Sequence, residues 1–259
     1  MNWDALDLSI LGPAFLAGLL VLSTHVPLGQ QVLARGIIFL DLAVAQIAGL
    51  GVIIAHNLDL GHHHYWVQAI ALGSAIVGSI LLYLSEKHFR DVQEAIIGCI
   101  FILAASGSIL LLSAHPHGGE QLKDLLVGQI LWLDYSQLIP VALIYALVLA
   151  LWFGFRNRRQ PLLFYILFAI TVTTSVQLIG IYLVFASLII PALAVRIAKH
   201  NKATLAFALG VAAYGFGLLI SALFDLPSGV TIVWTLAAFA ITLVALRKQR
   251  LFQALINRF

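Results

Sequence analysis

The chain has 259 residues, of which 62% are apolar and only 10% are charged. Soluble proteins average about 25% charged residues, so this composition, with a mean hydropathy of +1.03, excludes an ordinary soluble domain. The net charge of +3 is carried by short basic segments, which leaves no basic face for nucleic acid. The single cysteine, Cys99, excludes an internal disulfide, and its apolar neighbours predict a buried, unreactive thiol.

Nine apolar stretches follow one another along the chain, each close to the ~20 residues that cross a bilayer as a helix. We therefore predict an all-α, polytopic transmembrane bundle of eight to nine spans, forming one domain over residues 1–259. No basic residue precedes the first stretch, so we interpret it as a span and not as a cleaved signal peptide. The spans are expected at about 8–26, 37–56, 65–84, 94–113, 137–155, 161–178, 179–195, 203–223 and 229–246.

Basic residues lie in every second gap between the stretches. If the N-terminus is outside and the C-terminus inside, 13 of the 14 Lys and Arg residues lie on the inner side, and only Lys123 lies outside. Inner loops of membrane proteins carry the excess of Lys and Arg. The sequence therefore predicts this orientation, in contact with the lipid bilayer throughout.

Two regions leave the span count open. Residues 161–195 form one apolar run with Gly180 near its middle, which fits either two full crossings or a re-entrant pair. The segment Gln121–Leu133 is too polar and too short to cross, and we expect a short amphipathic helix at the outer surface or folded partly inward. Small residues four apart, as at Ala206/Gly210, predict close helix packing or a contact between two copies.

Asp41 lies inside the second predicted span, six residues after Arg35. Carboxylates inside membranes are costly and usually face a cavity, a partner or an ion path. We therefore place Asp41 on a transport path, with a structural alternative in which it bonds a helix end or reaches back to Arg35. Gln46 is a second polar candidate for the path, about 140° further around the helix.

The predicted outer gaps are rich in histidine. We expect a metal-capture patch there, because imidazole and carboxylate groups are the usual ligands of zinc and related metals, and the mixture suits Zn²⁺ better than Mg²⁺ or Ca²⁺ without excluding Mn²⁺. The alternative is a pair of polar loops with incidental histidines. The predicted metal-binding residues are His62, His63, His64, His115, His117 and Glu120.

The sequence contains no phosphate-cradling G-x-x-x-x-G-K motif, no H-E-x-x-H motif and no recognisable nucleophilic triad. We therefore expect a protein without enzymatic activity of its own and with no permanently bound cofactor. The energy for any active transport would have to come from a separate subunit or from an ion gradient.

Three segments together resemble the membrane permease of zinc/manganese-type ABC importers. They are PLGQQVLARGIIFLDLAVAQIAGLG, EAIIGCIFILAASGSILLL, and IGIYLVFASLIIPALAVR with DLPSGVTIV some 30 residues later. The resemblance implies a homodimeric permease of the bacterial inner membrane, with cytosolic ABC ATP-binding subunits and a periplasmic metal-binding protein as partners. Its transported substrate would be Zn²⁺ first, with Mn²⁺ or Fe²⁺ as alternatives.

The resemblance also assigns roles to particular residues. The stretch Ala194–Thr204 matches the family's cytoplasmic coupling region, although a role in orientation alone would also explain its charge. That family commonly has a histidine four residues after the helix aspartate, whereas this chain has Ala45 at that position. The residues expected to contact the ATPase are Arg196, Lys199, His200 and Asn201.

Three alternatives remain open from the sequence. The first is a secondary carrier that moves a cation or small solute with an ion gradient. The second is an ABC permease for a chelated metal, although such permeases are generally longer. The third is a membrane scaffold, which would leave the buried carboxylate and the histidine-rich gaps unexplained. Transport by the isolated chain without ATP would favour the secondary carrier.

Overall fold

The computed structural model describes residues 7–58, 60, 64–113, 115–155, 160–198 and 200–256, with the side chains of all of these except 64 and 248–256. Every regular element in this part of the chain is a helix, as the apolar periodicity predicts. The elements are α1 (Leu8–Arg35), α2 (Leu40–Asn57), α3 (His64–His88), η2 (Arg90–Val92), α4 (Gln93–Leu112), α5 (Gly118–Val127), η3 (Ile130–Trp132), α6 (Tyr135–Phe155), α7 (Pro161–Ile179), α8 (Ile181–Ala194), α9 (Lys202–Phe224) and α10 (Ser228–Ile256).

Eight of the described helices are long and apolar enough to cross a membrane. The span predicted at 179–195 corresponds to α8, which has 14 residues and is about 21 Å long at 1.5 Å per residue. That length is shorter than the ~30 Å hydrocarbon core, so α8 is not a full crossing by itself. The first span is longer than predicted, because α1 continues through Pro27 to Arg35.

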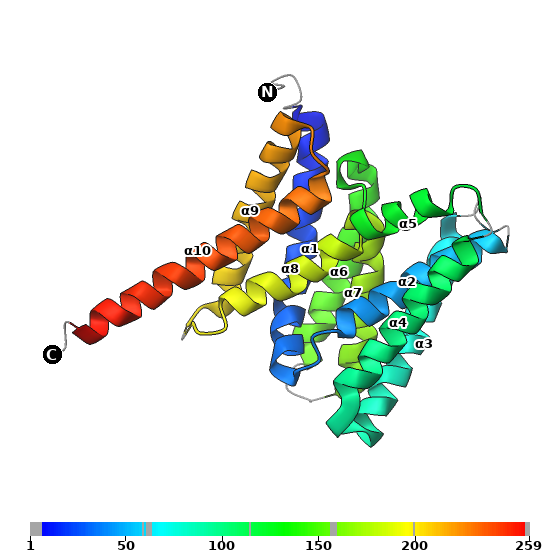
Figure 1. The fold of residues 1–259 in the computed structure, drawn as a ribbon, viewed down its shortest axis with the longest axis horizontal. Coiled ribbons are helices and arrows are strands. Elements are labelled where there is room, and N and C mark those ends of the chain that lie inside the picture. Colours follow the sequence, from blue (N-terminus) through cyan, green and yellow to red (C-terminus); the bar gives the residue numbers. More distant parts are fainter. Residues whose placement is uncertain are drawn as a thin grey trace.

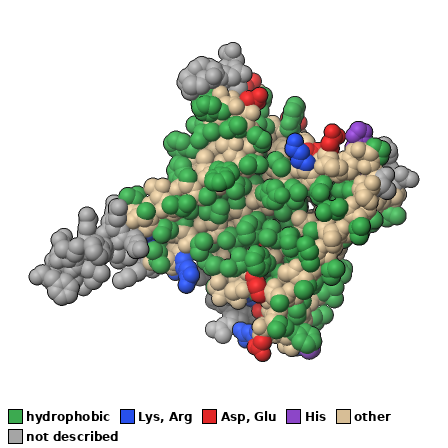
Figure 2. Space-filling view, in the orientation of Figure 1, with side chains coloured by type: hydrophobic (Ala, Val, Ile, Leu, Met, Phe, Trp, Pro, Cys, Tyr) green, Lys and Arg blue, Asp and Glu red, His purple; other side chains and the backbone are tan. Residues whose placement is uncertain are grey.

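The helices form a bundle with a projecting C-terminal helix (Figure 1). The C-terminal ends of α1 and α3 lie towards the bottom of the view, α8 ends towards the left and α10 extends furthest left, whereas the N-terminus and α5 lie towards the top. In Figure 2, charged side chains gather near these two margins and hydrophobic side chains cover the band between them. This distribution fits a membrane-spanning bundle; which margin faces the cytosol stays a prediction.

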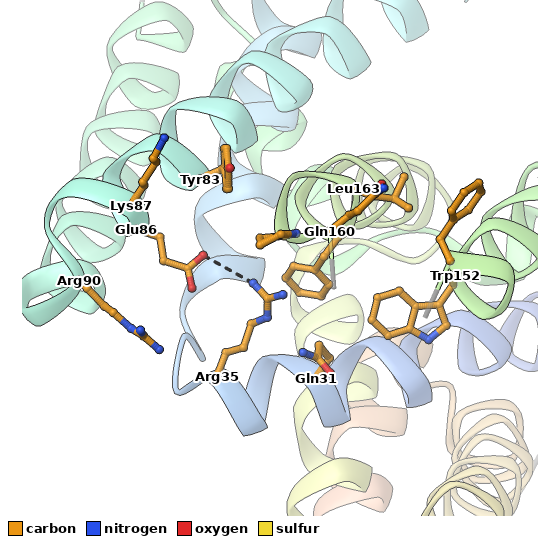
Figure 3. Close-up of a pocket in the computed structure, with 12 residues that line it drawn as sticks. Gln31, Arg35, Tyr83, Glu86, Lys87, Arg90, Trp152, Gln160 and Leu163 are labelled. Atoms are coloured by element: carbon orange, nitrogen blue, oxygen red, sulfur yellow. Dashed lines mark ion pairs between the residues drawn. The ribbon is translucent and has the colours of Figure 1, made fainter. Parts of the chain in front are cut away.

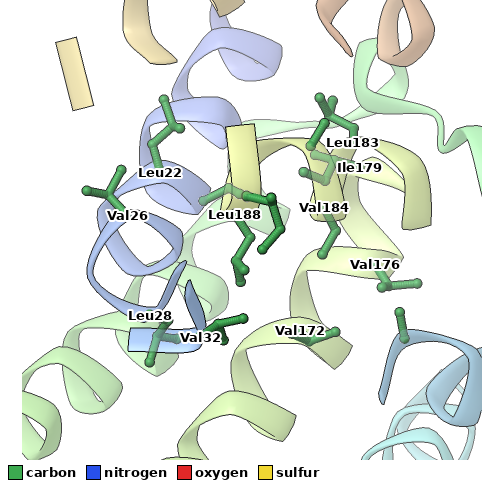
Figure 4. Packing of buried hydrophobic residues seen from close by; sticks show 14 of the residues in the cluster. Leu22, Val26, Leu28, Val32, Val172, Val176, Ile179, Leu183, Val184 and Leu188 are labelled. Atoms are coloured by element: carbon green, nitrogen blue, oxygen red, sulfur yellow. The ribbon is translucent and has the colours of Figure 1, made fainter. Parts of the chain in front are cut away.

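The centre of the bundle is built from α1, α7 and α8, whose aliphatic side chains interdigitate (Figure 4). Large apolar side chains also cover the outside, where Leu103 is 69% and Leu110 is 73% exposed. Lipid tails are as apolar as leucine, so close packing and not hydrophobicity separates the core from the periphery. Cys99 belongs to this periphery: it is exposed, and the prediction of a buried thiol is wrong.

Small residues let the helices approach closely. Because Gly210 has no side chain, the side chain of Leu22 packs against its backbone. Ile47 packs against Gly78 in the same way. Ala206 is fully buried within the same protomer. At these positions, the predicted small-residue faces serve packing inside one copy of the chain.

A sharp joint separates α7 from α8. Gly180 has φ 77° and ψ 161°, a backbone region that is essentially restricted to glycine. It packs directly against the backbone of Gly128, which follows α5. Helix α5 contacts α4, α7 and α8, so the short helix expected near 121–133 is present and packs onto the bundle. The joint at Gly180 lies next to α5. The re-entrant alternative places the turn between its two helices at this joint.

Candidate functional site

The strongest candidate site is the carboxylate of Asp41 in the first turn of α2. The Asp41 side chain is 0% exposed, and neither of its carboxylate oxygens has a hydrogen-bond partner among the described residues. Burying an unpaired carboxylate is costly. The nearby helix N-terminus offsets part of this cost, because the positive end of the macrodipole favours a negative charge. The described residues therefore leave both oxygens of Asp41 unsatisfied, which makes this carboxylate the candidate cation ligand.

The turn before α2 fixes the position of Asp41. Gly36 ends α1 in a left-handed conformation, with φ 74°, and its N–H donates to the carbonyl of Val32. The backbone N–H of Phe39 then donates to Oε1 of Glu94 in α4 at 3.1 Å. These two contacts hold the start of α2 against its neighbours, so the Asp41 carboxylate is carried by an anchored backbone.

Arg35 does not neutralise Asp41. Its Nη1 atom lies 3.5 Å from Oε2 of Glu86, and its guanidinium lies 4.4 Å from the centre of the Phe164 ring. Arg35 is therefore engaged by α3 and α7. The structural alternative in which Asp41 reaches back to Arg35 is wrong in this structure.

In the part of the chain that the structure describes, Asp41 has no second strong ligand beside it. Gln46 is buried, with 7% exposure, but a separation of five residues places it on a different face of α2. Ala45, which does share the Asp41 face, cannot coordinate. Among the described residues there is no group of three or more His, Cys, Asp and Glu side chains that could hold a metal ion. A cation at Asp41 would need further oxygen ligands from amides, hydroxyls, backbone carbonyls or water.

The outer histidines are only partly placed. His117 Nδ1 lies 3.4 Å from Glu120 Oε2, and both side chains are about four-fifths exposed (79% and 81%). His115 instead directs Nδ1 to the carbonyl of Leu111 at 3.2 Å. Two of the predicted ligands are therefore together in an exposed position beside α5. The other three lie outside this description: His62 and His63 are not among the described residues, and only the backbone of His64 is.

The predicted coupling segment is an exposed turn between α8 and α9. Arg196, His200 and Asn201 are exposed there, and Ile197 beside them is 56% exposed. Lys199 lies outside the described residues. Asn201 adopts a left-handed conformation, with φ 55°, immediately before α9. A protruding turn that presents basic and apolar side chains together suits a protein contact.

Comparison with known proteins settles the class of the chain. The sequence profile of the ABC 3 transport family matches residues 7–159 and 154–247. The chain belongs to the ABC 3 transport family. The membrane-spanning bundle described above is accordingly the fold of a family of transport proteins.

Individual relatives of this family cover nearly the whole chain. The high-affinity zinc uptake system membrane protein ZnuB of Haemophilus influenzae is 24% identical over 264 aligned positions, covering 93% of this chain and 99% of that protein. The manganese transport system membrane protein MntC of Halalkalibacterium halodurans is 23% identical, covering 88% and 84%. The structure of PsaBC from Streptococcus pneumoniae in complex with Fab matches with a TM-score of 0.72 at 20% identity, covering 90% of each chain.

One buried polar group in this family member escaped the sequence analysis. His25 in α1 is fully buried, and its Nδ1 lies 3.0 Å from the carbonyl oxygen of Val21. Because a carbonyl only accepts, Nδ1 of the neutral ring carries the hydrogen and Nε2 has a free lone pair. Nε2 is buried without a partner among the described residues. A histidine within a predicted span was the signal that could have identified it.

Proposed function

We propose that this ABC 3 family member is the permease subunit of an ATP-driven importer for a divalent transition metal. Relatives named for zinc and for manganese transport, of nearly the same length, support a metal substrate. Zn²⁺ is the first candidate, and Mn²⁺ and Fe²⁺ are the alternatives. No resident cofactor is involved, because the metal is the transported substrate.

The observation that carries the proposal is the Asp41 carboxylate, which is buried inside the membrane domain and whose two oxygens have no hydrogen-bond partner among the described residues. A dication passing this point would neutralise a charge that the protein itself leaves unpaired. A site with one strong ligand also binds weakly enough to release the ion, which transport requires. Gln46, on another face of α2, would contact the ion only before or after Asp41.

The partners follow from the missing energy source. The sequence has no nucleotide-binding motif, so a cytosolic ABC ATP-binding subunit would supply the work. We place this subunit against the turn of Arg196, Lys199, His200 and Asn201. A periplasmic metal-binding protein would deliver the ion at the opposite side of the bacterial inner membrane, and two copies of the chain would form the pathway.

The outer histidines would raise the local concentration of metal at the entrance. The exposed pair of His117 and Glu120 supports this role, because imidazole and carboxylate are both metal ligands. His115 and the His62–His64 run would extend the same capture patch.

The test of the proposed path is the isosteric change Asp41→Asn. Since the carboxylate makes no hydrogen bond, the amide should fold equally well, but it offers one neutral oxygen instead of an anion. Uptake of Zn²⁺ or Mn²⁺ by cells should fall by more than the roughly tenfold expected from losing a supporting group at a metal site, with unchanged assembly of the complex.

Asp134→Asn is the matched control, because Asp134 is an exposed carboxylate before α6. Its uptake should match the unmodified chain. Normal metal accumulation in Asp41→Asn would remove Asp41 from the mechanism.

A further inference from the structure

A cavity of about 800 Å³ opens where the predicted inner ends of four helices meet. The C-terminal ends of α1, α3 and α6 and the N-terminal end of α7 surround it, with η2 at the rim (Figure 3). This cavity is distinct from Asp41, from the outer histidines and from the turn between α8 and α9. None of the transport steps proposed above uses it.

Among the described residues, three cations and one anion line the cavity: Arg35, Lys87, Arg90 and Glu86. Glu86 pairs with Arg35, so the remaining charge is that of Lys87 and Arg90. Both are exposed, and neither forms an ion pair within the described part of the chain. A cavity with this net positive charge repels a transported cation and attracts an anion.

The opposite wall of the cavity is aromatic. Trp152 packs against Phe164, with ring centroids 6.0 Å apart, and Phe155 of α6 lines the same space. Tyr83 lies on the other wall, beside Lys87 (Figure 3). Figure 3 shows Trp152 on the far side of Arg35 from Lys87 and Arg90. Aromatic side chains at helix ends belong to the membrane interface, where headgroups and the first acyl carbons lie. A ligand that fills this space needs an anionic end and an apolar end.

We propose that this cavity binds an anionic phospholipid of the adjacent leaflet. Its phosphate would lie at Lys87 and Arg90, and its glycerol backbone and upper acyl chain would lie over Trp152. Basic pockets between transmembrane helices bind lipid phosphates in this manner, and phosphate suits the guanidinium fork of Arg90. A free phosphate ester shares the charge but lacks the apolar part, which is why the aromatic wall favours the lipid.

The test counts lipids retained by the full chain in native mass spectrometry after incubation with phosphatidylglycerol. The double variant K87Q/R90Q removes two exposed cations and leaves the Arg35–Glu86 pair in place. Retention should fall about fivefold per lost cation. Phosphatidylcholine should be retained weakly by both proteins, and glycerol 3-phosphate should not compete with phosphatidylglycerol at equal concentration.

The matched control is R196Q/R247Q, which removes two basic residues from the same predicted side of the membrane but outside the cavity. It should retain phosphatidylglycerol as the unmodified chain does. Equal losses in the two double variants would reduce the effect to general surface charge and overturn the proposal. Effective competition by glycerol 3-phosphate would also overturn it, because the site would then take a soluble phosphate ester.

A second readout follows the acyl chain. Phosphatidylglycerol with brominated acyl chains should quench the fluorescence of Trp152, measured as the difference between the unmodified chain and Trp152→Phe, and K87Q/R90Q should relieve that quenching. If K87Q/R90Q releases the ATP-binding subunit and leaves lipid retention unchanged, the cavity is a protein contact and the proposal fails. Neither measurement needs metal or ATP, so its failure leaves the proposed transport function untouched.

Discussion

At the scale of single residues, buried hydroxyl groups are paired across helices. The Tyr214 hydroxyl lies 2.7 Å from Ser187 Oγ, and Ser187 Oγ donates to the carbonyl of Leu183. Because the serine hydrogen is used within α8, Tyr214 is the donor of the bond that joins α9 to α8. Tyr145 and Ser175 repeat this arrangement between α6 and α7, at 2.6 Å. Inside a membrane there is little water to replace such partners.

Two substitutions of Tyr214 should distinguish what its ring contributes to stability from what its hydroxyl contributes. Tyr214→Phe removes one interhelical hydrogen bond and should lower the free energy of unfolding by about 0.5–1 kcal/mol. Tyr214→Ala also empties the space beside Gly18 that the ring fills. This variant should lower the free energy of unfolding by about 3–5 kcal/mol. Denaturant unfolding in detergent micelles measures both. Equal losses in the two variants would contradict this division.

Two residues show how far the sequence could predict individual positions. Asp41 was predicted to lie inside a membrane span, and it is fully buried in α2; its place on a transport path stays a prediction. Cys99 was expected to be buried because its neighbours are apolar, yet it is exposed. In a membrane protein, apolar neighbours do not distinguish the core from the lipid-facing surface, so the sequence contained no information on that choice.

At the scale of helices, the lengths of the apolar stretches predicted which helices are present better than they predicted where each helix ends. The predicted first span stops at residue 26, before Pro27, but α1 continues to Arg35. Proline is tolerated in transmembrane helices because neighbouring helices and side chains satisfy the freed backbone groups. The extra turns of α1 carry Gln31 and Arg35 to the cavity drawn in Figure 3. A propensity argument could not have foreseen them, because the tolerance comes from neighbouring helices.

The contact between α1 and α8 gives a sharp test of element packing. A Cβ atom at Gly29 would overlap the backbone carbonyl of Leu188, which cannot move aside as a side chain could. Gly29→Ala should therefore destabilise the bundle by about 1–3 kcal/mol, seen as a lower thermal unfolding midpoint in detergent.

Gly98→Ala is the control for this substitution, because it also lies inside a helix but has no atom within 4 Å of the added Cβ. It should leave stability unchanged, or raise it by up to ~1 kcal/mol through helix propensity. A Gly29→Ala protein as stable as Gly98→Ala would show that the two helices do not meet closely at this point.

At the scale of the whole molecule, the sequence predicted the architecture because two coarse patterns agree. Apolar stretches of membrane length specified the helices, and eight long apolar helices are present in the described part of the chain. Basic residues in alternate gaps specified the sides of the membrane, and that orientation stays a prediction; the C-terminal ends of α1 and α3 do lie towards the same end of the bundle (Figure 1). The cavity of Figure 3 could not be predicted, because it joins residues from four helices that are far apart in sequence.

The candidate site was predicted only in part for the same reason. Asp41 could be identified from one helix, whereas any further ligands must come from elements whose neighbours a single sequence does not reveal. The pairing of Arg35 with Glu86 across 51 positions likewise has no local signal. Family membership then supplied the transport class, which neither composition nor periodicity could define.

The most direct test of this account is metal uptake into proteoliposomes that contain the permease, its ATP-binding subunit and the metal-binding protein. We predict that Zn²⁺ or Mn²⁺ accumulates only when ATP and all three proteins are present, and that the permease alone transports nothing down or against an imposed ion gradient. Gradient-driven uptake by the permease alone, without ATP or partners, would contradict the account and favour a secondary carrier.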